Sequence, residues 1–188
     1  TNNSDAEIAG ANFPNIRLFS VPLIASPQPQ DDVKGQWVTC SPATVPDFSA
    51  VLFYFGRELH KELNTPVGLI HTPWGGTPAE AWTSRGALSA DPDLKHMVDT
   101  WDKKLADYPA AQAEYEKKKA EYDAAAEKAK AAGQPEPDNK PKAPDGPASS
   151  WLASGLYNAM INPLVPFSVK GAVWYQGESN AGRAYQYR

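Results

Sequence analysis

Cysteine and histidine are scarce in this sequence. Among 188 residues there is one cysteine, Cys40, and there are three histidines. A single cysteine excludes an intrachain disulfide and any metal site built from several cysteines. It does not decide the redox compartment in which the protein folds.

The chain also lacks a surplus of basic residues and a long apolar run. Its 18 Lys and Arg residues are outnumbered by 22 Asp and Glu residues, and the formal net charge is −4. Because proteins that bind nucleic acid usually carry a basic stripe, this balance argues against a nucleic-acid partner. No run of about 18 apolar residues occurs, so we expect no membrane span.

The composition that remains is that of a globular protein. Hydrophobic residues make up 41% of the chain and charged residues 21%, which is an ordinary balance for a folded domain. A chain of 188 residues is long enough to bury a sizeable core. It opens on Thr1, and we expect this start to lie within a domain.

Short apolar runs alternate with helical patterns in the first part of the chain. Residues 15–22, 35–42 and 67–71 are predicted as strands. Between residues 48 and 63, apolar residues recur at helical spacing. They are Phe48, Val51, Leu52, Phe55, Leu59 and Leu63. Asn64 is expected to end this helix. The order strand, helix, strand favours a βαβ unit and a parallel sheet.

The same order returns near the end of the chain, where residues 155–166 are predicted as a helix and residues 169–175 as a strand. In open α/β folds, ligands bind at the carboxyl edge of the parallel strands. We therefore expect the segments that follow residues 71 and 175 to face one site.

Residues 90–148 interrupt this alternation, and we expect them to form a helical and proline-rich insertion. Asp91 is a plausible N-cap with Pro92 at the first helical position, and Gly133 is expected to end the helix. Residues 101–145 carry 10 acidic residues and 9 lysines, as a solvated helix does. One interpretation is a surface insertion without a functional role. The other is a lid or a rim over the substrate site.

The first candidate loop follows residue 71. Gly75 and Gly76 let the backbone approach a ligand and present unshielded N–H groups. Trp74 offers a flat surface of the kind that packs against sugar rings. The alternative is a tight strand-to-helix turn in which Thr77 caps the helix and Pro78 opens it.

The second candidate loop begins at Gln176, where the apolar run of residues 169–175 gives way to small and polar residues. Gln176 and Asn180 carry side-chain amides that donate hydrogen bonds, whereas ionised Glu178 only accepts them. The alternative is a polar strand end in which Glu178 has a capping role.

Both loops carry a family resemblance. The stretches "VGLIHTPWGGTPAEAW" (67–82) and "GAVWYQGESNAGRAYQYR" (171–188) resemble the second and third sequence blocks of the sialate O-acetylesterase family, within the SGNH hydrolase superfamily. The stretches around them, "DAEIAGANFPNIRLFSVP" and "LYNAMINPLVPFSVKG" among them, resemble the same family. The resemblance covers nearly all of the chain except about 90–148.

The resemblance implies a flavodoxin-like three-layer α/β/α sandwich with a parallel sheet, which removes acetyl groups from sugars. A serine attacks the ester carbonyl, and N–H donors stabilise the oxyanion that develops. By the match, Gly75 or Gly76 supplies one donor. The superfamily's asparagine donor aligns with Ser179, one residue before Asn180. Gln176 is therefore the first candidate for that donor and Asn180 the second.

The resemblance also implies auxiliary roles and some missing parts. Trp74, Thr77 and Glu178 would orient the substrate or the loops. The family's Gly-Gln-Ser-Asn block, which holds the nucleophile, does not occur in these residues, and neither does its Asp-x-x-His block at the family's place after the third block. We expect this chain to be a central portion of the esterase domain, inactive alone, with the remainder of the domain as its partner.

Other functions remain open at this point. The chain could be a non-catalytic carbohydrate-binding relic of the same fold, or a flavodoxin-like module for another ligand. The acetylated sugar could be sialic acid or acetylated xylan. By resemblance, the protein is secreted or periplasmic and needs no cofactor or metal.

Overall fold

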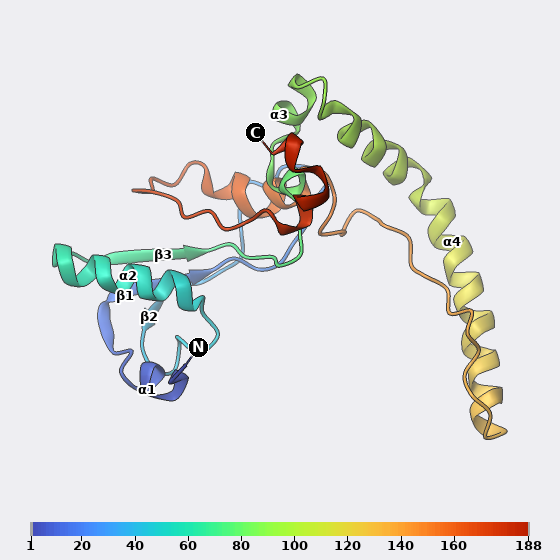
Figure 1. Cartoon of the computed structure of the whole chain (residues 1–188), viewed down its shortest axis with the longest axis horizontal. Helices are drawn as coiled ribbons and strands as arrows, with labels where there is room; N and C mark the ends of the chain where they lie inside the picture. The colour runs from blue at the N-terminus through green and yellow to red at the C-terminus, as the bar shows by residue number, and fades with distance from the viewer. Residues whose placement is uncertain (1, 188) are drawn as a thin grey trace.

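The computed structural model describes residues 2–187 and shows a mixed α/β arrangement (Figure 1). Helix α1 (Ser4–Ala9) leads into strand β1 (Phe13–Ser20) and the short strand β2 (Val38–Cys40). Helix α2 (Ala50–Leu63) and strand β3 (Val67–His71) follow. The strand order is β2-β1-β3, so β1 lies in the middle of the sheet.

The strands predicted at 15–22, 35–42 and 67–71 are confirmed, but their expected parallel direction is wrong for β2. β3 runs parallel to β1, whereas β2 runs antiparallel to it. The reason lies in the connection: the chain leaves β1, turns back through residues 21–37 and returns alongside it. The βαβ unit therefore joins β1 to β3 through α2, and β2 belongs to the crossover.

Helix α2 begins and ends where expected. The side chain of Ser49 accepts a hydrogen bond from Leu52 N at 3.3 Å, as an N-cap does. Asn64 takes the left-handed conformation with φ 47° and ends the helix. Local sequence chemistry thus sets both ends of this helix.

The buried face of α2 agrees only in part with the one that the apolar spacing predicts, since Phe48 is buried and Leu52 packs against the core. Phe53 and Gly56 are its buried residues, and a Cβ on Gly56 would lie 2.5 Å from Cδ2 of Leu69 in β3. The helix docks on the sheet through this glycine because only a hydrogen atom fits there. Residues predicted on the core face are instead exposed: Val51, Phe55 and Leu63.

Two apolar clusters lie on opposite faces of the sheet. On one face, Leu18 and Leu69 pack with Phe53 of α2. On the other face, Phe19 packs with Leu156 and Met160. Leu156 directly precedes helical turn η2 (Tyr157–Ile161), which contains Met160 and is followed by helical turn η3 (Asn162–Leu164). The helix predicted at 155–166 is thus confirmed as a series of short helical turns.

The strand predicted at residues 169–175 is wrong. This segment pairs with no strand of the described chain, and its apolar side chains are exposed, with Val169 at 61% and Trp174 at 59%. A strand needs a neighbour to satisfy its backbone groups. The sheet formed within residues 2–187 ends at β3 on one side and at β2 on the other.

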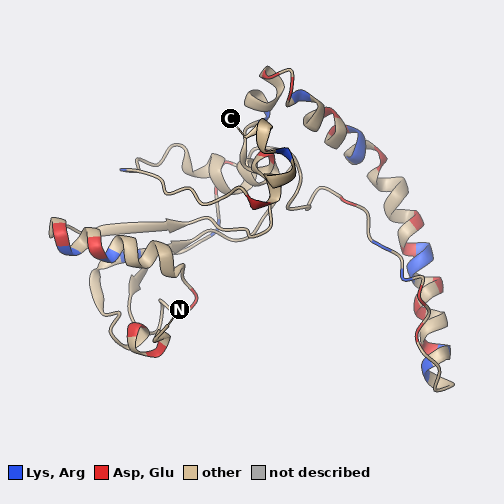
Figure 2. Ribbon diagram, viewed as in Figure 1, with Lys and Arg blue, Asp and Glu red and all other residues tan. Residues whose placement is uncertain are grey.

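A long hairpin leaves the rest of the molecule, as Figure 1 shows. Helix α3 (Arg85–Ala90) leads into helix α4 (Lys95–Ala131), and the chain returns beside α4 without regular structure. We call residues 103–145 the arm, and the remaining described residues the head. Figure 2 shows acidic and basic residues interspersed along the arm, and several form i,i+4 ion pairs such as Lys103–Asp107 and Lys119–Asp123.

Aromatic residues of α4 pack on the proline-rich return segment. Tyr122 is 8% exposed and its hydroxyl lies 3.3 Å from Glu136 Oε2. Gly146 lies so close to Tyr108 that a Cβ there would come within 2.3 Å of the ring. Tyr108, Tyr115 and Tyr122 follow one another by heptads, so they lie on one side of the helix and present a row of rings.

The root of α4 is buried. Its buried side chains are Met97 (8% exposed), Val98 (2%) and Trp101 (9%). Arg85 of α3 forms a bidentate ion pair with Asp102, with N–O distances of 2.8 and 2.6 Å. The first turns of α4 therefore pack on α3 and the head, whereas the arm extends beyond them. Among the helices of residues 2–187, none is long and apolar enough to cross a membrane.

Candidate functional site

The loop after β3 is a tight turn around Gly75 and Gly76. Gly76 has φ 72°, a conformation that favours glycine. The turn is closed by Thr77, whose Oγ1 donates to Trp74 O at 2.7 Å. A residue with positive φ at this place is typical of the third position of a type II turn, which explains why the second glycine is needed.

The two glycines are exposed, with open space around their Cα atoms. A Cβ built on Gly75 or Gly76 would meet no atom within 4 Å. Within residues 2–187, neither backbone N–H donates to a protein acceptor. Two unshielded donors at the carboxyl end of a parallel strand are suited to an anionic or polarised oxygen.

Thr77 joins the two ends of this loop by hydrogen bonds and does not cap the helix, as the alternative interpretation would have it. It is 5% exposed, and its Oγ1 accepts a hydrogen bond from Trp82 Nε1 at 2.8 Å. Helical turn η1 (Ala79–Trp82) begins after Pro78 without a side-chain cap. The reason is that the hydroxyl of Thr77 is already engaged by Trp74 and Trp82.

The second candidate loop meets the first through Gln176. Its Nε2 donates to Thr77 O at 3.1 Å and to Asn180 Oδ1 at 2.8 Å. Both N–H groups of this amide are therefore engaged by protein acceptors. Its Oε1 is buried and has no partner among the described residues.

Asn180 lies at the junction of the two loops and is 5% exposed. Its Oδ1 also accepts from Ala79 N at 2.8 Å, and its Nδ2 donates to Glu80 Oε2 at 3.0 Å. The amide is thus satisfied on both sides. It belongs to helical turn η4 (Glu178–Gln186), which follows Gly177 at φ 149°.

Sequence reasoning missed Glu80 and Arg183. Arg183 Nη2 lies 2.6 Å from Glu80 Oε1, and the side chains are 33% and 12% exposed. A carboxylate close behind a turn predicted to face the site is a signal that could have singled out Glu80. Nothing local indicates Arg183 as its partner, because the two residues are 103 positions apart.

The remaining predicted residues lie at the margin of this junction. Glu178 is exposed at the start of η4. Trp74 is partly buried against the cluster that contains Phe19 and Met160. His71, at the end of β3, packs against Phe48 with ring centroids 5.3 Å apart, and burial lowers the pKa of its imidazole.

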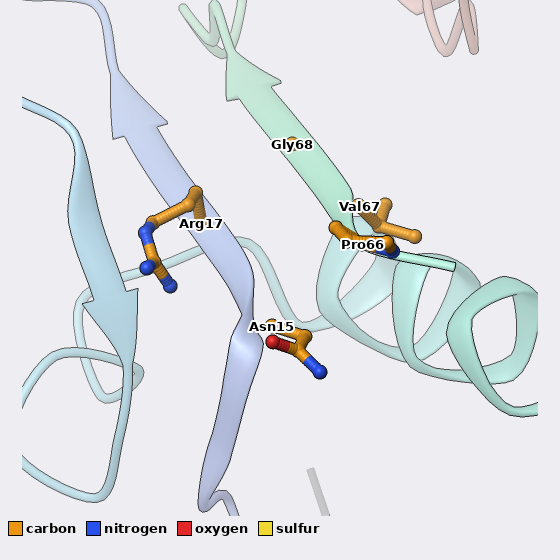
Figure 3. A pocket seen from close by; sticks show the side chains of 5 residues that line it. All are labelled: Asn15, Arg17, Pro66, Val67 and Gly68. Atoms are coloured by element: carbon orange, nitrogen blue, oxygen red, sulfur yellow. The ribbon is translucent and has the colours of Figure 1, made fainter. Parts of the chain in front are cut away.

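A separate hollow lies away from this junction. It is an open depression of about 300 Å³, lined by Asn15, Arg17 and residues 66–68, which are labelled in Figure 3. It lies at the amino ends of β1 and β3, whereas the two candidate loops lie at the opposite, carboxyl side. Within residues 2–187, no group of three or more His, Cys, Asp and Glu side chains is arranged to hold a metal ion.

The chain is similar to sialate O-acetylesterases. It is 33% identical to that of Rattus norvegicus over 200 aligned residues, which cover 95% of this chain and 32% of the relative. It is 31% identical to that of Homo sapiens over 187 residues, again 95% of this chain but 28% of the relative. The chain therefore spans less than a third of the length of these relatives.

A solved structure is similar as well. A carbohydrate acetylesterase from Xanthomonas citri matches 95% of this chain, and 28% of its own, with 29% sequence identity and a TM-score of 0.60. No protein-family model matches the sequence.

Proposed function

Because the chain is a homologue of the sialate O-acetylesterases over 95% of its length, we propose that it forms part of a carbohydrate O-acetylesterase. The reaction is hydrolysis of acetyl esters on sugars. One observation carries the assignment to this site: the hydrogen bonds of Gln176 join the two loops that resemble the family's blocks, beside the open amides of Gly75 and Gly76.

The chemistry asked of the loops is stabilisation of an oxyanion. When a nucleophile attacks an ester carbonyl, negative charge develops on the carbonyl oxygen, and donors already in place lower the barrier. The free N–H groups of Gly75 and Gly76 fit this task. Gln176 contributes a third donor once the substrate oxygen replaces Thr77 O or Asn180 Oδ1 as the acceptor of one of its N–H groups.

The nucleophilic serine and its histidine are proposed to lie outside these 188 residues. Two features support a remainder of the domain that docks on this chain. Residues 169–175 are apolar, exposed and unpaired within the described chain, and α2 presents Val51 and Phe55 to solvent. Covering both would extend the sheet and complete a three-layer α/β/α sandwich with a mostly parallel sheet. The protein would be secreted or periplasmic.

A non-catalytic carbohydrate-binding relic is the second candidate. The observation that favours it is the absence of a Gly-Gln-Ser-Asn block from the sequence, together with a Gln176 amide whose donors are both engaged. An intact polypeptide without the serine and histidine blocks would support the relic. The sugar could be acetylated xylan rather than sialic acid in either case.

The test compares Gln176→Ala with Asn180→Ala in the intact polypeptide, using a small acetyl ester. Gln176→Ala is expected to lower kcat by about 10²–10³ with little change in KM, because the lost bond is made chiefly in the transition state. The 188-residue chain alone is expected to show no turnover, because removal of a triad abolishes all but residual catalysis.

Opposite results reassign the site. If Gln176→Ala stays within about threefold of the parent kcat while Asn180→Ala abolishes turnover, Asn180 is the donor. If both variants keep the parent kcat, the loop serves the fold alone. Turnover that follows the purified 188-residue chain in proportion would show a nucleophile within it.

A further inference from the structure

The carboxylate of Glu80 lies between the two candidate loops. Its side chain is 12% exposed, and each oxygen meets a different residue of the second loop. Oε1 accepts from Arg183 Nη2 at 2.6 Å and Oε2 from Asn180 Nδ2 at 3.0 Å. Its backbone O also accepts from Ser154 N at 2.9 Å, so three separate segments meet at this residue.

The carboxylate of Glu80 and the N–H of Ala79 together determine which way the amide of Asn180 faces. An ionised carboxylate accepts hydrogen bonds and donates none, so Asn180 has to turn its Nδ2 toward it. The reverse orientation would place two oxygens against each other. In the observed orientation, Asn180 Oδ1 faces Gln176 Nε2 and Ala79 N, both at 2.8 Å.

The amide of Gln176 is oriented in turn. Because Asn180 Oδ1 and Thr77 O are both acceptors, Gln176 has to present Nε2 to them. Its Oε1 is left buried and without a partner in the described chain. A flipped Gln176 would set its oxygen against two others, so Thr77 O and Asn180 Oδ1 together fix its orientation. Glu80 acts on Gln176 through Asn180.

Arg183 offsets the cost of holding a carboxylate in this place. A charge that is mostly withdrawn from water is stable only with a partner, and Arg183 supplies it at 2.6 Å. Its Nη1 also lies 3.8 Å from Met97 Sδ at the root of α4. Arg183 therefore connects the second loop both to the first loop and to the root of α4.

We propose that Glu80 is a positioning residue for ester hydrolysis, which acts by orienting the amides of Asn180 and Gln176. The inference rests on the function proposed above. Glu80 does not contact the reacting atoms, and its effect on the reaction passes through the two amides. The position of the donors depends on a residue of the other loop, 96 positions before Gln176 in the chain.

Glu80→Gln tests the proposal because it keeps the size of the side chain but gives it donors as well as an acceptor. The one side-chain oxygen of glutamine cannot accept from both Asn180 Nδ2 and Arg183 Nη2, so one of these donors faces the new NH₂ group. The side chain of Asn180 is then displaced, and with it an acceptor of Gln176. In the intact polypeptide, kcat on a small acetyl ester should fall by about 10- to 100-fold with KM within about threefold, as expected for misplaced catalytic groups. Glu80→Asp keeps the charge and should recover part of the loss.

Glu114→Gln is the matched control. Glu114 lies on α4 in the arm, is 57% exposed and pairs with Lys118, so the substitution removes an ion-paired carboxylate away from the junction. It should leave kcat and KM on the small ester unchanged. A second readout uses the 188-residue chain labelled with ¹⁵N: the side-chain amide resonances of Gln176 and Asn180 should shift in Glu80→Gln and stay unchanged in Glu114→Gln.

Three results overturn the proposal. Unmoved amide resonances in a folded Glu80→Gln chain show that Glu80 does not orient the amides. A kcat within about twofold of the parent, in a background where Gln176→Ala is inactive, shows that the orientation has no catalytic effect and leaves the proposed function standing. If Gln176→Ala and Asn180→Ala are themselves fully active, the oxyanion assignment fails, and with it the catalytic role of Glu80.

Discussion

The head and the arm are stabilised by contacts of different reach. In the head, polar contacts join residues that are far apart in the chain, such as Asn180 with Glu80 and Asn158 with Ser26. In the arm, three ion pairs join residues four positions apart. Lys104–Asp145 joins the helix to the segment that the hairpin brings back directly after α4. Contacts of short reach form without the rest of the molecule, whereas those of the head need the whole fold.

This difference predicts which single substitutions destabilise the protein. A helix whose exposed ion pairs each contribute about 0.3–0.5 kcal/mol loses little when one is removed. A buried amide that satisfies several groups at once leaves all of them unpaired when it is removed. The head should therefore respond sharply to single substitutions, and the arm to changes in its repeated aromatic contacts.

The largest effect should come from the boundary between the two regions. Replacing residues 103–145 by a short Gly/Ser linker should leave the free energy of unfolding of the head within about 1 kcal/mol of the parent, because mainly exposed ion pairs are lost. Replacing 92–147 also removes Met97, Val98 and Trp101 and should cost roughly 5 kcal/mol. Urea unfolding of both variants measures the difference. If both variants have the same free energy of unfolding, the root of α4 does not contribute to the stability of the rest of the head.

Asn180→Ala should be the next most damaging change. It leaves Ala79 N without a partner and removes one hydrogen bond each from Gln176 and Glu80. An unsatisfied buried group costs about 1–3 kcal/mol, so we expect a loss of about 3 kcal/mol in the free energy of unfolding. Asn139→Ala, at an exposed position of the arm, is the control and should stay within about 0.5 kcal/mol. A loss below about 1 kcal/mol for Asn180→Ala would contradict the buried network.

Tyr122→Ala should loosen the arm and spare the head. Removing the ring deletes the contact with the return segment and the hydrogen bond to Glu136, with a local cost of about 2 kcal/mol. Hydrogen exchange should speed up in residues 118–138, while the melting transition of the head stays in place. Glu121→Ala, on the exposed side of the same turn, should change neither. A lower melting temperature of the head in Tyr122→Ala would show that the arm and the head unfold together.

Ser154→Gly should be mildly stabilising. Ser154 has φ 63°, is 2% exposed, and its hydroxyl has no partner within the described chain. Glycine relieves the backbone strain and removes the orphan hydroxyl, for a gain of about 1 kcal/mol. Ser154→Ala removes the hydroxyl but keeps the strain, so it should gain less. If Ser154→Gly instead unfolds more easily, a buried partner for the hydroxyl is indicated.

The fold was predictable wherever the information is local. The ends of α2 follow from Ser49 and Asn64, and the end of α4 follows from Gly133, which has φ 65°. The buried face of α2 was only partly predictable from its apolar spacing, because the close approach of Gly56 to Leu69 depends on how the helix docks. Residues 169–175 carry a strand's composition, yet a strand forms only beside a pairing edge.

The site was predictable in part for the same reason. The candidate residues Gly75, Gly76, Gln176 and Asn180 follow from loop position and side-chain chemistry, and the structure brings both loops together. The pairing of Glu80 with Arg183 was not predictable, because nothing near either residue in the sequence indicates the other. The catalytic roles of these residues stay predictions.

Because the arm is a hairpin, a change in the length of α4 affects the segment that returns beside it. Seven residues of α-helix rise about 10.5 Å, and three to four residues of extended, proline-rich chain rise about 9–12 Å. Tyr108, Tyr115 and Tyr122 repeat every seven residues, and Pro137, Pro141, Pro144 and Pro147 repeat every three or four. Tyr108 meets Gly146 and Tyr122 meets Glu136, so a heptad added to or removed from the helix should need a matching change in the return segment. Related proteins should differ in arm length by such paired steps.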